Sequence, residues 1–134
     1  MKRYDLLSPR GRASGLGSAN AGFGNWWMER VTAIALVPLT IWFAGSLITR
    51  SSDDYNEVIG WLGSPLTVIL MVLLLTALFW HIALGLQVVI DDYIHSAAKI
   101  WVLLTVRFAC LLLGLTGIIA NLYIAFGVPM SGGA

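Results

Sequence analysis

Three long apolar runs constrain the fold of this chain more than any other feature. They cover residues 31–48, 66–90 and 100–128, and the charge-free part of the third is residues 108–128. A helix rises about 1.5 Å per residue, and the hydrocarbon core of a bilayer is about 30 Å thick. Each run is therefore long enough to cross as a helix, which satisfies its own backbone hydrogen bonds in lipid. The sequence predicts an all-α integral membrane protein with three transmembrane helices.

Composition supports this class and excludes others. The 134 residues are 58% hydrophobic and 11% charged, whereas soluble domains carry about 25% charged residues. The net charge of +1 argues against a nucleic-acid partner. Cys110 is the sole cysteine and lies in an apolar run, so a disulfide or a cysteine metal site is not expected.

The flanking segments divide the chain into three parts. Residues 1–30 form an N-terminal arm, residues 31–128 the transmembrane domain, and residues 129–134 a short tail. Small residues dominate 14–24, which predicts an extended segment at the membrane surface. Trp26 and Trp27 are typical of a membrane interface. Residues 50–64 are expected to form a polar loop, and Pro38 to kink the first span.

Lysine and arginine predict the orientation. Five lie before the first span, Arg50 alone lies in the first loop, and Lys99 and Arg107 flank the start of the third span. Cytoplasmic segments collect such residues. A cytoplasmic N-terminus places seven of the eight inside, so the loop after the second span also faces the cytoplasm.

His81 is the one histidine within the spans, and an ionisable residue there suggests function. One interpretation is a neutral imidazole bonded to a neighbouring helix, and the other is a ligand of haem iron. Gly85 lies one turn away on the same stripe, where it leaves room for a flat ligand, and Phe79 and Trp80 add aromatic surface. His95 is 14 residues further on, so a second axial histidine has to come from another chain.

The same helix carries a second group of polar residues at its end. Asp92 follows His81 by 11 residues, roughly 16–17 Å along a helix. A group bound at His81 is thus expected near mid-membrane, and one bound at Tyr93 near the surface. Arg107 has two interpretations: its side chain snorkels to the inner surface, or it is the partner of a bound anion.

These residues resemble a known family. The pattern His81-x3-Gly85-x6-Asp92-Tyr93, the opening Arg30-Val-Thr-Ala of the first span, and the stretch 85–95 are similar to the hydrophobic membrane anchor of succinate dehydrogenase, respiratory complex II. The anchor meant is the smaller of the two in that complex. The resemblance covers roughly residues 14–100 and the three-span plan.

The resemblance implies a four-chain enzyme. It favours the bacterial cytoplasmic (inner) membrane as its location over the mitochondrial inner membrane. The implied partners are a flavoprotein that oxidises succinate, an iron–sulfur protein and a second membrane anchor. The implied cofactors are haem b, shared between the anchors, and ubiquinone. Carried over, His81 is the axial haem ligand, with Arg30 near the haem and Gly85 packing against it. Tyr93 and Asp92 correspond to quinone-binding residues.

Two other classes remain open on the residues alone. A small multi-span transporter needs an acidic residue inside a span to bind cations, and residues 31–48, 66–90 and 108–128 contain none. A haem-free structural anchor that docks a soluble enzyme is the third hypothesis, and the polar loops fit it.

Overall fold

The computed structural model describes residues 18–127, and side chains from residue 23 onward. This part of the chain consists of four helices: α2 (Ser18–Thr49), α3 (Tyr55–Leu62), α4 (Pro65–Tyr93) and α5 (Ala98–Ala125). α2, α4 and α5 are long and apolar enough to cross a membrane. The predicted all-α class with three transmembrane helices is confirmed. The predicted tail and most of the predicted arm lie outside the described residues.

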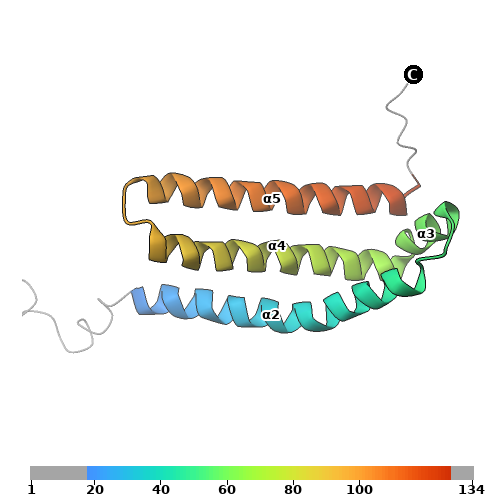
Figure 1. The fold of residues 1–134 in the computed structure, drawn as a ribbon, viewed down its shortest axis with the longest axis horizontal. Helices are drawn as coiled ribbons and strands as arrows, with labels where there is room; N and C mark the ends of the chain where they lie inside the picture. Colours follow the sequence, from blue (N-terminus) through green and yellow to red (C-terminus); the bar gives the residue numbers. More distant parts are fainter. Residues whose placement is uncertain (1–17, 128–134) are drawn as a thin grey trace, which may run out of the picture.

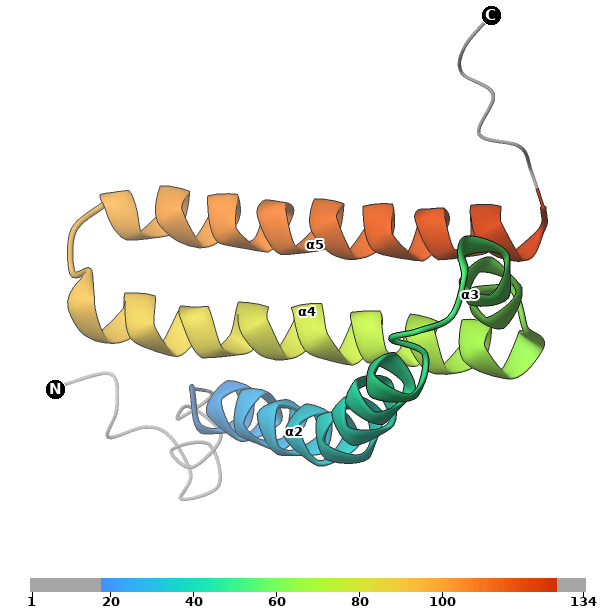
Figure 2. The ribbon, with the colours of Figure 1, turned by 45° about the vertical axis from the view of Figure 1, so that its right-hand side comes forward.

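The three long helices lie side by side with α4 in the middle. α5 runs along one side of α4 and α2 along the other (Figure 1; Figure 2). Successive long helices are antiparallel, so the start of α2, the end of α4 and the start of α5 share one end of the molecule (Figure 1). α3 lies at the opposite end, where it contacts α4 and α5.

The first helix begins earlier than the sequence predicted. α2 starts at Ser18, so the expectation of an extended segment over 14–24 is wrong for residues 18–24. Once a helix is nucleated, each added residue gains a hydrogen bond. A helical glycine such as Gly24 costs about 1 kcal/mol relative to alanine, so the small residues of this stretch weaken the helix without preventing it. Pro38 lies inside α2, whose second half bends away from the first in both views (Figure 1; Figure 2).

The connection between the first two spans is partly helical, so the prediction of a polar loop over 50–64 is wrong. A capping box starts α3: the Glu57 amide donates to Oδ1 of Asp54 at 2.9 Å, and the Asp54 amide donates to Oε2 of Glu57 at 3.3 Å. Asp-x-x-Glu before apolar residues is a sequence signature of a helix start. That signal was present at residues 54–57 and was missed.

Two glycines let α5 approach α4 closely. A Cβ placed on Gly114 would lie 3.3 Å from Phe79 Cδ2, and one on Gly117 would lie 3.2 Å from Leu75 Cδ1. Small residues at such positions are typical of helix pairs in membranes, where close packing replaces the hydrophobic effect. The close α4–α5 contact therefore depends on glycine, which has no side chain, at these two positions.

Few side chains of the described residues are buried within this one chain. Leu74, Ile90 and Cys110 form its buried apolar core, and most large apolar side chains are exposed. A chain like this needs lipid or other transmembrane helices around it, since apolar faces of this size cannot face water.

Candidate functional site

His81 is held at the contact between α4 and α2. Its Nδ1 lies 3.1 Å from the hydroxyl oxygen of Thr32. Thr32 is only 7% exposed, and its hydroxyl also lies 2.8 Å from the Met28 carbonyl oxygen and 3.0 Å from that of Glu29. His81 itself is half-buried. The imidazole is thus anchored through one ring nitrogen, and Nε2 is the nitrogen available to a ligand.

The surroundings of His81 differ in part from the sequence interpretation. A Cβ placed on Gly85 would have no atom within 4 Å, so there is open space on this stripe. Phe79 does not flank His81, because it packs against Gly114 of α5. Residues 79 and 81 are about 200° apart around a helix, and one faces α5 while the other faces α2.

The contact with Thr32 sets the level of His81 relative to the neighbouring helices. Because the two side chains are in contact, His81 of α4 lies at the same level as Thr32 of α2. Arg30 precedes Thr32 by two residues, which is about 3 Å along the axis of α2. On the other side of α4, Arg107 of α5 lies at the level of Gln87. Gln87 follows His81 by six residues, which is about 9 Å along the axis of α4. Charged residues on both neighbouring helices thus begin close to His81. His81 is two residues past the middle of the candidate span Pro65–Tyr93, and its position near mid-membrane stays a prediction.

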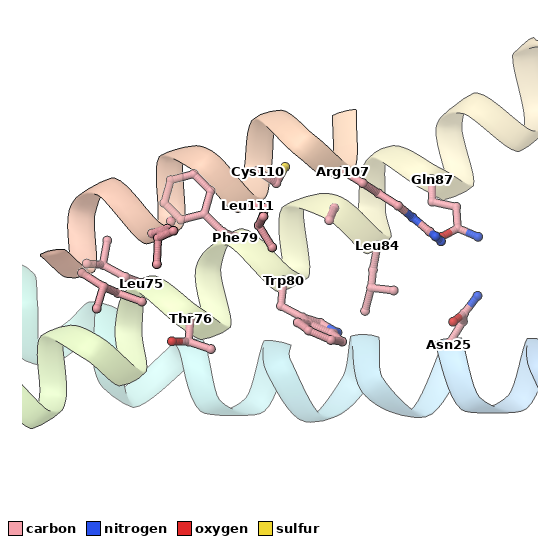
Figure 3. A pocket seen from close by; sticks show the side chains of 14 residues that line it. Asn25, Leu75, Thr76, Phe79, Trp80, Leu84, Gln87, Arg107, Cys110 and Leu111 are labelled. Carbon is pink, nitrogen blue, oxygen red and sulfur yellow. The ribbon is translucent and has the colours of Figure 1, made fainter. Parts of the chain in front are cut away.

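A groove of about 600 Å³ lies beside this region, between α4 and α5 and near the start of α2. Its wall is mostly apolar, and Figure 3 shows Phe79 and Trp80 along it. The polar residues Asn25, Gln87 and Arg107 gather at one end of it (Figure 3). His81 is not among the lining residues, so the groove and the histidine open on different sides of α4.

Arg107 has a partner that the sequence did not indicate. Its Nη2 donates to Oε1 of Gln87 at 2.8 Å, which joins α5 to α4. The side chain is exposed and lies at the polar end of the groove. The amide of Gln87 holds the guanidinium of Arg107 at the polar end of the groove; the snorkelling side chain and the partner of a bound anion both stay predictions.

The end of α4 presents the other predicted site residues. Tyr93, the last residue of α4, is 82% exposed, and Asp92 is also exposed. The structure distinguishes the two aspartates: Oδ1 of Asp91 lies 2.9 Å from Nζ of Lys99, while Asp92 has no ion pair among the described residues. Asp91 therefore ties α4 to α5, and Asp92 keeps a free carboxylate beside Tyr93.

Arg30 lies on α2 near the level of His81. Its guanidinium is 5.2 Å from the centre of the Trp26 ring, a cation–π distance. Arg30 is exposed and has no salt bridge within the described part of the chain. Its charge is available to an acidic group near His81.

Residues 18–127 contain no cluster of three or more His, Cys, Asp or Glu side chains that could hold a metal ion. The fold and these groups define a three-span helical membrane protein with one histidine inside its spans and an exposed tyrosine and carboxylate at the end of the same helix.

Comparison with known proteins agrees with this class. Residues 6–116 match the family described as succinate dehydrogenase/fumarate reductase transmembrane subunit. A succinate dehydrogenase hydrophobic membrane anchor subunit of Rickettsia bellii (strain RML369-C) is 34% identical over 68% of this chain and 73% of its own length. The corresponding protein of Rickettsia conorii (strain ATCC VR-613 / Malish 7) is 28% identical over 90% of this chain and 97% of its own. That of Paracoccus denitrificans is 28% identical over 69% and 72%.

The chain belongs to the family of succinate dehydrogenase/fumarate reductase transmembrane subunits. The resemblance drawn from the motifs around Arg30 and His81 is thereby confirmed at the level of the family. It is an integral membrane protein, as its three long apolar helices indicate.

Proposed function

We propose that this chain is a hydrophobic membrane anchor of a succinate:quinone oxidoreductase, which docks the succinate-oxidising subunits and helps to bind haem b and ubiquinone. The main support is one arrangement: a single helix, α4, carries His81 inside the span and Asp92 and Tyr93 at its exposed end. Tyr93 is 12 residues past His81, about 18 Å along the axis. The named relatives are anchors of this kind.

The residues around His81 fit a haem. Imidazole is a common axial ligand of haem iron, and Nε2 of His81 is the nitrogen that Thr32 leaves available. The open space at Gly85 suits the edge of a flat macrocycle. Arg30 is two residues from Thr32 and would offer its charge to a propionate. When bound, haem b would hold one electron near the quinone.

The end of α4 fits a quinone headgroup. A phenol at Tyr93 can donate a hydrogen bond to a quinone carbonyl, which gains negative charge as it is reduced. Asp92 is an exposed carboxylate beside it, suited to pass protons from the aqueous side. Asp91 is engaged with Lys99, so we assign the quinone-proximal role to Asp92.

We also infer the orientation and the partners. The start of α2, the end of α4 and the start of α5 share one end (Figure 1), and Arg30, Lys99 and Arg107 lie toward it. That end is cytoplasmic by the distribution of positive residues, in a bacterial inner membrane. A cytoplasmic iron–sulfur protein with its flavoprotein would dock there, close to Tyr93. A second anchor would cover the exposed apolar faces and supply the other axial ligand.

The decisive test is purification of the complex from native membranes, followed by a reduced-minus-oxidised spectrum of wild type and His81→Ala. We expect a flavoprotein and an iron–sulfur protein to co-purify with a b-type haem. His81→Ala should abolish or alter the low-spin haem spectrum, while electrons still reach the quinone through the iron–sulfur route.

Other results would favour the alternatives. A lone oligomer of this chain would favour a transporter, although residues 31–48, 66–90 and 108–128 contain no carboxylate. Partners without haem or bound quinone would favour a structural anchor. An unaltered haem spectrum in His81→Ala would exclude His81 as the ligand.

A further inference from the structure

We infer that Thr32 is a positioning residue for the haem ligand: its hydroxyl oxygen accepts a hydrogen bond from the Nδ1–H of His81 and so fixes the tautomer whose Nε2 lone pair would be available to haem iron. This inference rests on the proposed haem-binding role of His81. It concerns a residue on a different helix, α2, and adds a role for that helix in tuning the ligand.

The direction of the hydrogen bond follows from counting protons. A threonine hydroxyl has one proton and two acceptor lone pairs. Two backbone carbonyl oxygens, of Met28 at 2.8 Å and Glu29 at 3.0 Å, already lie within reach of that proton. A carbonyl has no proton to give, and two oxygens at 2.8 Å repel each other unless a proton lies between them, so we place the hydroxyl proton on this pair. In the tautomer that we infer, the imidazole is therefore the donor in the 3.1 Å contact between Nδ1 of His81 and the hydroxyl oxygen.

The tautomer decides what the ring can bind. Neutral imidazole has one N–H and one lone pair. With the proton on Nδ1, the lone pair is on Nε2, which is ready to ligate a metal without first losing a proton. A hydrogen bond from the other ring nitrogen also fixes the ring orientation and raises the basicity of a metal-ligating histidine.

The position of Thr32 suits this role. It is one of the few buried polar residues of the described chain, at 7% exposure, so water has little access to its hydroxyl group. Thr40 provides a matched comparison on the same helix. Its hydroxyl makes the same kind of contacts, to the carbonyl oxygens of Leu36 at 2.6 Å and Val37 at 3.1 Å, but it is exposed.

The test uses the assembled complex with Thr32→Val, Thr32→Ser and Thr40→Val. Valine keeps the shape of threonine and removes the acceptor. We expect the haem midpoint potential of Thr32→Val to rise, because a less basic ligand stabilises ferric iron less, and its low-spin electron paramagnetic resonance signal to shift. Haem loss to an apoprotein acceptor should be about 10- to 100-fold faster. Thr32→Ser should restore the wild-type potential, and Thr40→Val should not change it.

The outcomes separate this inference from the proposed function. A wild-type potential and signal in Thr32→Val would overturn the inference, as would an equal shift in Thr32→Ser, which would indicate a packing effect. If Thr32→Val does not assemble, Thr32→Cys, whose sulfur is a weak acceptor, should give a haem potential above that of the wild type, and a wild-type potential in Thr32→Cys would overturn the inference. Loss of haem in His81→Ala together with an unchanged Thr32→Val would refute only the role of Thr32, whereas an unaltered His81→Ala would refute the haem ligation itself.

Discussion

At the scale of single residues, the end of α4 separates side chains that look equivalent in the sequence. Asp91 and Asp92 are neighbours, yet Asp91 contacts Lys99 at 2.9 Å, and Asp92 lies exposed next to Tyr93. The side chains of the Asp91–Lys99 pair are 41% and 35% exposed, and such pairs contribute about 0–1 kcal/mol. Asp91 therefore has a structural contact of small energy, and Asp92 and Tyr93 remain free to meet a substrate.

Tyr93→Phe tests the proposed quinone site at this scale. The substitution keeps the ring and removes one hydrogen-bond donor. Losing a hydrogen bond to a group that becomes charged costs about 1.5–3 kcal/mol, which corresponds to roughly a ten- to hundredfold lower rate when the bond acts in the transition state. We expect quinone reductase activity to fall by that factor. Succinate oxidation with a dye that takes electrons from the soluble subunits should hardly change, and neither should the haem spectrum.

The control for this experiment is Asp91→Asn, which removes the negative charge that pairs with Lys99 and should leave both activities near wild type. A parallel loss of both activities in Tyr93→Phe would make Tyr93 an assembly residue. Two unchanged activities would mean that Tyr93 is an interfacial tyrosine and that the quinone binds elsewhere.

At the scale of elements, α4 links the three spans. Its polar contacts with neighbours are spread along its length: Thr32 of α2 meets His81, Gln87 meets Arg107 of α5, and Nδ2 of Asn121 lies 3.4 Å from the Val68 carbonyl oxygen. Between these contacts, the glycines of α5 let the two backbones approach. Displacing α5 would therefore disturb the helix that holds both candidate sites.

Gly114→Val tests this packing. A Cβ at Gly114 already meets three atoms of Phe79 at 3.3–3.4 Å, and valine adds two methyl groups. Overpacking of this kind typically costs about 1–3 kcal/mol, so we expect a lower melting temperature of the purified complex. Gly45→Val is the matched control, because a Cβ at Gly45 has no atom within 4 Å. Equal melting temperatures for the two variants would contradict a packing role for Gly114.

At the scale of the whole molecule, polar groups are divided unequally between the two ends. Arg30, Lys99 and Arg107 belong to the end that holds Tyr93. The opposite end has Arg50, whose Nη1 lies 3.2 Å from Oδ2 of Asp53 and whose guanidinium lies 5.0 Å from the Trp61 ring centre. The one positive side chain of this end, among the described residues, is thus already paired. This asymmetry strengthens the inference that the Tyr93 end faces the cytoplasm.

Single cysteines at the two ends test that orientation in a Cys110→Ala background. Ser96→Cys lies between α4 and α5, and Ser52→Cys lies between α2 and α3; both positions are exposed. We expect a membrane-impermeant maleimide to label Ser96→Cys only in inside-out vesicles and Ser52→Cys only in right-side-out vesicles. The reverse pattern would show that the N-terminus is outside. Weaker labelling at position 96 when the soluble subunits are bound would support docking at this end.

The class of fold could be predicted from the amino-acid sequence alone, since three uncharged runs of membrane-spanning length leave helices as the simplest way to satisfy the backbone in lipid. The sequence also identified His81 and the end of its helix as candidate sites. A histidine inside an apolar run, and polar residues directly after that run, stand out from the apolar residues around them. The early start of α2 and the helix α3 are local features for which the sequence-based expectations were wrong.

Contacts between residues far apart in the chain emerged from the packing of the helices. Thr32 and His81 are 49 positions apart, and no periodicity within either span indicates that they face each other. The same holds for Gln87 and Arg107, and for the pairing of Lys99 with Asp91 rather than Asp92. A hydrophobic pattern indicates which face of a helix contacts lipid or protein. The axial position of one helix relative to another is determined by side-chain packing between them. In this chain that packing depends on Gly114 and Gly117, which present no side chain opposite Phe79 and Leu75.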